Sequence, residues 1–181
     1  MKKYSLLLIQ PLLFFLALSF TNTSAAQSAD DKALIADAKA GTEDFIHTDA
    51  LMKNLFDNAY GYAIFPNIGK GAVTVGGATG NGIVYEKGAM IGKAKMIQIS
   101  VGFQFGGQAY REVIFFENKE TLDRFKENKI EFSAQASAVA AKKGASTNVK
   151  YTNGVLIFTQ QKGGLMYEAS IGGQKFKFTP F

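Results

Sequence analysis

The spacing of apolar residues divides the chain into an N-terminal helical part and a longer part typical of β-strands. Between residues 30 and 57, apolar side chains recur at near-helical spacing, with acidic side chains between them. From Tyr60 onward the apolar runs are short, and glycine, asparagine or proline separates many of them. This pattern predicts helices first and a sheet afterwards. The expected strands are residues 60–65, 71–77, 82–87, 94–102, 108–117, 131–140, 154–160, 165–171 and 174–179.

Two helices are predicted in the N-terminal part and one inside the sheet region. Asp30 or Asp31 can cap the first helix, and Thr48 is expected to cap the second. Asn118 is expected to cap the inserted helix, which spans residues 120–128. The polar face of the N-terminal helices is acidic, whereas membrane-surface helices usually carry lysine or arginine. Packing of these helices on the sheet is therefore favoured over membrane binding.

The stretch from Tyr60 to Gly82 combines strand-like runs with strong interruptions. Pro66 and Asn67 are expected to end its first strand, because proline has no N–H to donate and asparagine favours turns. Asn81-Gly82 is typical of a hairpin turn. Glycine pairs inside strands indicate bulges, bends or the close approach of another backbone. We expect such a structural role for Gly76, Gly77, Gly106 and Gly107.

The connections between the predicted strands are short, which favours antiparallel pairing. Many contain a turn-forming pair, such as Lys87-Gly88, Asn153-Gly154 and Gly172-Gly173. The sequence therefore predicts an α+β fold. It should be a curved, mainly antiparallel β-sheet, or partial barrel, with N-terminal helices and one inserted helix. A single domain is expected over residues 27–181.

The N-terminus has the features of a targeting segment. Lys2 and Lys3 precede an apolar run, and the small residues Ser24, Ala25 and Ala26 follow it. The run is shorter than the ~20 residues of a spanning helix. We therefore expect residues 1–26 to be a cleaved signal peptide, with an uncleaved anchor as the alternative. The predicted location is periplasmic or secreted.

The residue types needed for catalysis or metal binding are scarce. The chain has no cysteine and one histidine, His47, at a predicted helix break. There is no Gly-x-Ser-x-Gly elbow, no phosphate-binding loop motif and no EF-hand spacing. We therefore expect no enzyme activity, no metal site and no cofactor. An enzyme of unfamiliar type remains an alternative.

Charge is unevenly distributed along the chain. Residues 30–57 contain seven acids and three lysines, whereas residues 58–181 contain fifteen basic and eight acidic residues. A basic sheet region favours an anionic partner, although a merely solvated surface explains the charge equally well. Nucleic acid is not expected, because only two residues are arginine and no helix is arginine-rich. The lysines predicted to contact lipid are Lys70, Lys142, Lys143, Lys175 and Lys177, of which the last two share one strand face.

Four stretches then occur in a characteristic order: FPNIGKGAVTVGG, SVGFQFGGQ, VIFF and KGGLMYEASIGGQKF. Together they resemble the successive signatures of the SYLF domain, from about Leu34 to Phe178. This domain binds lipids; it is known from eukaryotic proteins that bind phosphoinositides and actin, and it is common in bacterial exported proteins. The matching residues are mainly glycines and apolar core positions, so the resemblance assigns no lipid-contacting residue.

The predicted function combines this resemblance with the basic sheet region. We expect a non-enzymatic lipid-binding domain at an anionic phospholipid or membrane surface in the cell envelope. Actin binding is poorly transferable to a chain with a bacterial-type signal peptide. The alternative is a small outer-membrane β-barrel or a structural envelope protein, which the signal peptide and the C-terminal Phe181 would fit. A protein partner in the envelope is a further possibility.

Overall fold

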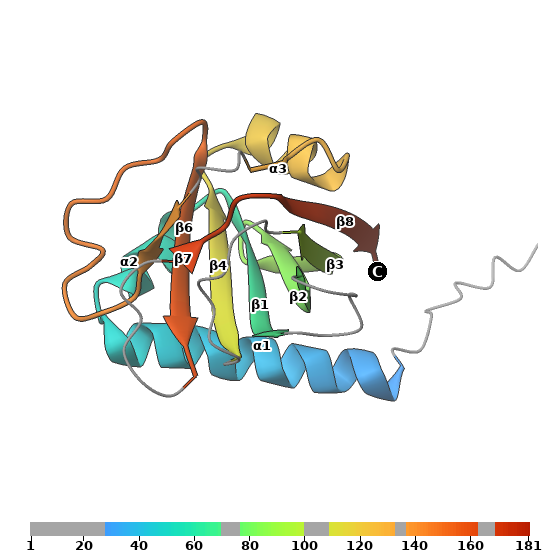
Figure 1. Cartoon of the computed structure of the whole chain (residues 1–181), viewed down its shortest axis with the longest axis horizontal. Coiled ribbons are helices and arrows are strands. Elements are labelled where there is room, and N and C mark those ends of the chain that lie inside the picture. Colours follow the sequence, from blue (N-terminus) through green and yellow to red (C-terminus); the bar gives the residue numbers. More distant parts are fainter. Residues whose placement is uncertain (1–27, 70–76, 100–108, 133–136, 163–168) are drawn as a thin grey trace, which may run out of the picture.

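The computed structural model of the chain describes residues 28–69, 77–99, 109–132, 137–162 and 169–181. Within these ranges, three helices and eight strands follow one another. Figure 1 shows α1 lying across one side of the sheet, with α3 on the opposite side. The elements in chain order are α1 (Ala29–Thr48), α2 (Met52–Asn58), β1 (Gly61–Gly69), β2 (Gly77–Glu86), β3 (Ala89–Ile99), β4 (Tyr110–Phe116), α3 (Lys119–Lys126), β5 (Ser137–Ala140), β6 (Val155–Gln161), β7 (Ala169–Ser170) and β8 (Gln174–Pro180).

The strands form one sheet in the order β7-β5-β6-β4-β1-β2-β3-β8. Neighbouring strands are antiparallel, except that β5 and β6 are parallel. The sheet is strongly curved, and residues that lie close together in the chain pair with strands near both of its ends. Glu131 pairs with Lys175 on β8, and β5, which follows this residue in the chain, pairs with β6. The predicted α+β fold with a curved, mainly antiparallel sheet is confirmed.

Side chains are buried on both faces of the central strands. The outer face packs against α1 and α2, where Phe45 of α1 and Met52 of α2 are fully buried. The inner face packs against α3 and the segment that begins at Ile130. Because both faces are covered, β1, β4 and β6 contain continuous apolar runs instead of an alternating pattern.

The N-terminal helices begin differently from the sequence prediction. Ser28, not Asp30 or Asp31, caps α1: its hydroxyl accepts a hydrogen bond from the Asp31 N–H at 3.1 Å. Thr48 is the last residue of α1, and α2 has no side-chain cap. The break is held instead by Asp49, a residue that is 3% exposed and accepts hydrogen bonds across the loop. The prediction of two helices in this part is confirmed.

The predicted turn at Pro66 and Asn67 is wrong, because β1 continues through both residues. The strand accommodates them with a bulge. Phe65 pairs with Glu112 and Ile68 with Tyr110, so three steps on β1 oppose two on β4. A bulge releases a residue from the hydrogen-bond ladder, which removes the need for the missing proline N–H.

The predicted hairpin turn at Asn81-Gly82 is also wrong, since both residues lie inside β2. A Cβ atom on Gly82 would lie 2.5 Å from the Ile64 carbonyl oxygen and 2.7 Å from the Phe65 ring. Close backbone packing, not a turn, therefore requires glycine here. The turn at Lys87-Gly88 is confirmed, with φ angles of 49° and 79°.

The inserted helix is confirmed with its cap. The Asn118 side chain accepts a hydrogen bond from the Thr121 N–H at 3.0 Å. The predicted strand 131–140 is realised as a bridge at Glu131 and the short strand β5, and the residues between 132 and 137 lie outside the described ranges. Most of the predicted strand 71–77 also lies outside them. In the part of the chain that is described, no helix has the length and apolar character to cross a membrane.

Candidate functional site

Strands β3 and β8 present one alternating face to solvent. In β3, the residues Ala94, Met96 and Gln98 are buried, whereas Lys95, Ile97 and Ile99 are exposed. In β8, Gln174 and Phe176 are buried, and the lysines that follow each of them are exposed. The buried set points toward α3 and the inner core. The exposed set forms what we call the β3–β8 face, made of Lys95, Ile97, Ile99, Lys175 and Lys177.

The register places these exposed residues directly beside one another. Lys177 lies opposite Lys95, and Lys175 lies opposite Ile97. Like charges that face each other across two strands destabilise the sheet. The Lys95–Lys177 pair therefore does not stabilise the fold. An anionic partner bound at this face would neutralise the two charges.

Few acidic side chains neutralise the β3–β8 face. Lys175 pairs with Glu131 at 3.2 Å, but both side chains are more than half exposed, and such pairs contribute little. Lys95 and Lys177 form no ion pair with any residue that the structure describes. At the border of the face, Lys93 binds Asp31 at 2.7 Å and ties α1 to β3.

Two isoleucines complete this face. Ile97 is 38% exposed and Ile99 is 64% exposed, so this face carries two large aliphatic side chains beside its lysines. They were not predicted from the sequence as contact residues. The alternation from Ala94 to Ile99 could have indicated them, since it places both isoleucines on the side of Lys95.

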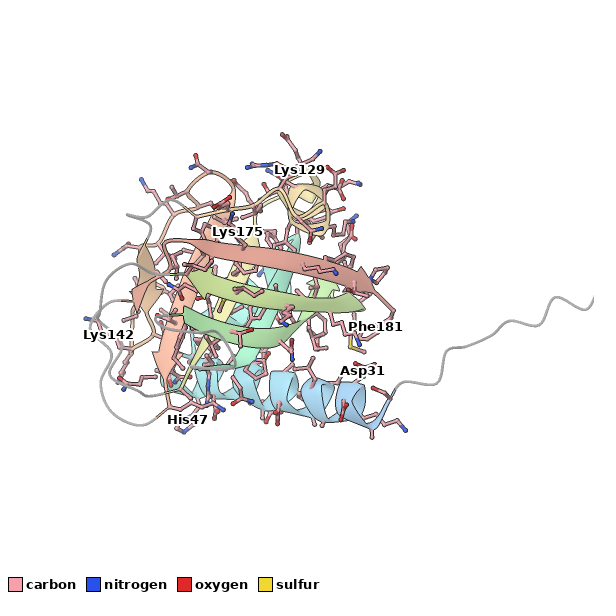
Figure 2. All side chains as sticks on the ribbon, turned by 45° about the vertical axis from the view of Figure 1, so that its right-hand side comes forward. Asp31, His47, Lys129, Lys142, Lys175 and Phe181 are labelled. Atoms are coloured by element: carbon pink, nitrogen blue, oxygen red, sulfur yellow. The ribbon has the colours of Figure 1, made fainter. Side chains whose placement is uncertain are left out.

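The structure brings together only some of the lysines predicted from the sequence. Lys175 and Lys177 lie on the same face, as predicted. Lys142 and Lys143 lie in the loop after β5, and Figure 2 shows Lys142 well apart from Lys175. Lys70 lies outside the described residues. The lipid contacts themselves stay a prediction.

The predicted structural glycines fall mostly outside the described residues. This applies to Gly76, Gly106 and Gly107. Gly77 is described as the first residue of β2, where it pairs with Ile99. A structural role for these four glycines stays a prediction.

A second polar group lies inside the curved sheet, where sequence reasoning did not expect one. Glu112 on the inner face of β4 is fully buried. Its Oε2 atom accepts a hydrogen bond from Gln174 Nε2 at 3.0 Å. Burial raises the pKa of Glu112 to about 7, and the hydrogen bond from Gln174 opposes part of that rise. The Glu112 carboxyl group therefore changes charge near neutral pH.

The neighbours of Glu112 are polar and equally enclosed. Thr159 lies opposite Glu112 in the β4–β6 register, and Gln98 accepts a hydrogen bond from the Tyr110 hydroxyl at 3.1 Å. Of the four buried side-chain oxygens that lack a hydrogen-bond partner in the described part of the chain, three belong to Glu112 and its neighbours: Glu112 Oε1, Thr159 Oγ1 and Gln174 Oε1. A protonated Glu112 could donate to one of them, whereas an ionised Glu112 could not.

Groups suited to catalysis do not converge in the described residues. His47 is exposed in the last turn of α1, as Figure 2 shows at the edge of the molecule. No cluster of three or more histidine, cysteine, aspartate or glutamate side chains that could hold a metal ion occurs within the described ranges. The β3–β8 face can bind anions through lysine charges and can contact apolar groups through its isoleucines.

Two comparisons with known proteins point to the same kind of domain. Residues 97–179 match the Ysc84 family, described as Las17-binding protein actin regulator. This match begins in β3 and ends in β8. The chain is also 34% identical over 125 residues to Beta cell expansion factor A of Aeromonas veronii. That alignment covers 68% of this chain but 48% of the relative, so the chain spans about half the length of this curated protein.

Proposed function

Because this chain belongs to the SYLF (Ysc84) domain family, a family of binding domains, we propose that it is a non-enzymatic lipid-binding protein. It would act at an anionic membrane surface in the cell envelope. Export by a cleaved signal peptide in residues 1–26 is part of this proposal, and those residues lie outside the described ranges. The lipid partner would be an anionic phospholipid.

The observation that carries the proposal is the pairing of Lys95 with Lys177 beside exposed isoleucines. Protection of an edge strand by lysine would explain Lys175 and Lys177, since β8 is at one end of the sheet. It would not explain exposed Ile97 and Ile99, because aliphatic residues there invite aggregation. A membrane surface accounts for both features. Lysines near anionic headgroups contribute about 1 kcal/mol each, and isoleucine side chains can enter the interface.

The test compares vesicles of neutral phosphatidylcholine with vesicles that also contain anionic phosphatidylglycerol. The protein should sediment with the anionic vesicles and only weakly with the neutral ones. Added salt should release it, because the screening length falls from about 10 Å at 0.1 M salt to about 3 Å at 1 M. The double variant Lys175→Glu, Lys177→Glu should lose on the order of 2–4 kcal/mol of binding free energy.

The matched control is Lys142→Glu, Lys143→Glu, which makes the same charge change in the loop after β5. If the β3–β8 face is the contact surface, this control should lose clearly less binding. Equal losses for the two double variants would show that only net charge matters. Equal binding to neutral and anionic vesicles would refute the electrostatic mechanism. Absence of binding to both would favour a protein partner in the envelope.

A further inference from the structure

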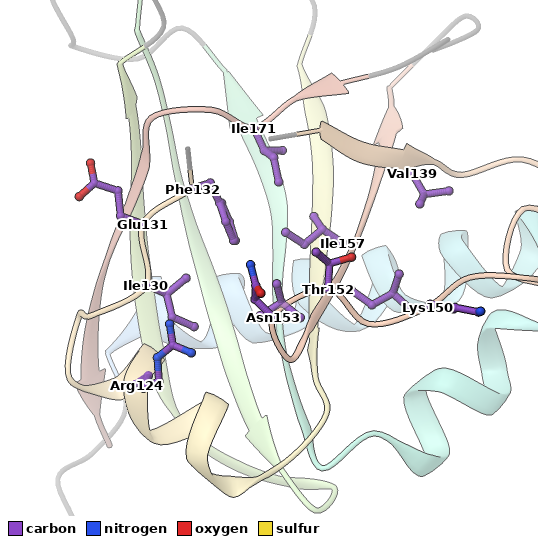
Figure 3. A pocket seen from close by; sticks show the side chains of 12 residues that line it. Arg124, Ile130, Glu131, Phe132, Val139, Lys150, Thr152, Asn153, Ile157 and Ile171 are labelled. Carbon is purple, nitrogen blue, oxygen red and sulfur yellow. The ribbon is translucent and has the colours of Figure 1, made fainter. Parts of the chain in front are cut away.

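A cavity of about 510 Å³ opens between α3, the start of β6 and residues 130–132 (Figure 3). This volume lies within the range of about 300–1,000 Å³ that is typical of small-molecule sites. Its apolar wall is continuous with the inner core of the curved sheet, because the same side chains belong to both. These side chains are Ile130, Phe132, Ile157 and Ile171.

The mouth of the cavity is polar. Arg124 reaches it from α3, and Asn153 reaches it from the turn before β6. Figure 3 shows Asn153 near Phe132 in the middle of the cavity lining, with Arg124 beside Ile130 on the α3 side. The turn is held in place by Gly154, which has a φ angle of 80° and packs so closely on Thr121 that a Cβ atom would not fit. Asn153 itself has a φ angle of 52°.

Arg124 is an exposed cation of α3 that lines the cavity, and it also lines a neighbouring hollow together with Glu120, Asp123 and Glu127. Arg124 forms no ion pair with the residues that the structure describes. The acidic side chain that lines the cavity, Glu131, pairs with Lys175 and points away from the cavity in Figure 3. A planar guanidinium can bind a carboxylate through two parallel hydrogen bonds, and an amide that lines the same cavity can donate a further one.

From this geometry we propose that the cavity binds one single-chain anionic amphiphile of the fatty-acid class. The carboxylate lies at Arg124 and Asn153. The hydrocarbon chain runs along Phe132 and Ile157 toward the inner core. The choice of a lipid as ligand class rests on the proposed function. The cavity has none of the five residues of the β3–β8 face in its lining, although Glu131 at its border pairs with Lys175 of that face.

Fluorescence of a dansyl-labelled undecanoic acid tests the site without any membrane. The probe should bind the whole purified protein with increased emission. Oleic acid should displace it, and neutral oleyl alcohol should displace it less well. Both competitors are kept below the concentrations at which they aggregate.

The variant Arg124→Gln should weaken oleic acid binding by about tenfold or more, because a charge-assisted hydrogen bond is lost. It should leave oleyl alcohol binding unchanged. The matched control is Lys129→Gln, which removes an exposed cation just after α3 that does not line the cavity. This control should leave both ligands unaffected. Equal weakening by Arg124→Gln and Lys129→Gln would overturn the proposal.

A second variant, Val155→Phe, adds volume from a half-buried position at the cavity wall. It should weaken oleic acid and oleyl alcohol alike, with an unchanged circular dichroism spectrum. Lack of probe binding to the wild-type protein, or unaltered binding in Val155→Phe, would overturn the proposal. Either result would leave the vesicle experiment intact. Conversely, loss of anionic-vesicle binding with normal fatty-acid binding would refute the membrane mechanism and support the cavity.

Discussion

Replacement of Glu112 by glutamine should change how the stability of the protein depends on pH. Glu112 is fully buried, and its burial raises the pKa of the carboxyl group from 4.5 to about 7. The folded protein therefore keeps this group neutral over a pH range in which the unfolded chain ionises it. Glutamine is neutral at every pH and preserves the shape of the side chain, so the variant removes this difference.

The sign of the effect follows from proton linkage. A carboxyl group whose pKa is higher in the folded state stabilises the protein fully below its unfolded pKa, and this stabilisation is lost as the pH rises through the folded pKa. Between about pH 4.5 and pH 8, the wild-type protein should lose on the order of 3 kcal/mol of unfolding free energy from this group. Asp31, Asp49 and Asp123 have lowered pKa values, so they act at lower pH and do not obscure this range.

The measurement is urea unfolding followed by circular dichroism at several values between about pH 5 and pH 8. Wild-type stability should fall across this range, whereas the curve for Glu112→Gln should be nearly flat. Near pH 8 the variant should be the more stable protein, and its side-chain amide can donate to the unpaired Thr159 or Gln174 oxygens. The control is Glu117→Gln, an exposed acid next to β4. An identical slope in wild type and Glu112→Gln would refute the reasoning.

Two further predictions concern stability. Gly82→Ala should destabilise the fold by about 1–3 kcal/mol, since its Cβ would clash with a β1 carbonyl oxygen, whereas Gly69→Ala, with nothing within 4 Å, should not. Denaturant unfolding of both variants measures this, and equal stability would contradict it. Asp49→Asn should cost about 1–2 kcal/mol at neutral pH, because Ser146 donates two hydrogen bonds, at 2.9 and 2.7 Å, to its carboxylate. Burial alone would raise the pKa of Asp49, but the hydrogen bonds to its carboxylate outweigh it and lower the pKa. The difference between wild type and Asp49→Asn should therefore shrink as the pH falls below the ordinary value of 3.8 and vanish below the lowered pKa of the folded state. The exposed control Asp57→Asn should not show this change.

Local signals in the sequence predicted those elements whose cause is also local. The side-chain oxygen of Asn118 caps α3, and the Lys87-Gly88 turn has the positive φ angles that its residues favour. The period of two in the last strand placed Lys175 and Lys177 on one face. Each of these features depends on contacts within a few residues, so it can be read without knowledge of the fold.

Local signals failed where a distant strand set the conformation. Asn81-Gly82 has the residues of a hairpin turn, yet β1 and β3 pair with both sides of this segment and hold it extended. Proline often ends a strand, yet β1 continues on both sides of Pro66 because a bulge against β4 accommodates it. In both cases the hydrogen bonds of the sheet and the contacts in the core stabilise the extended conformation by more than the local preference for a turn opposes it.

The sequence by itself determined the fold class, the helical and strand-rich parts, and the excess of lysine over the sheet. Only the tertiary structure decided which charged residues meet. Lys95 and Lys177 are far apart in the chain and become neighbours through the β3–β8 register, and Glu112 becomes buried because the sheet curves around it. Composition and periodicity describe each strand alone. The partners of a side chain, and therefore its pKa and its exposure, depend on how the strands pair across the whole sheet.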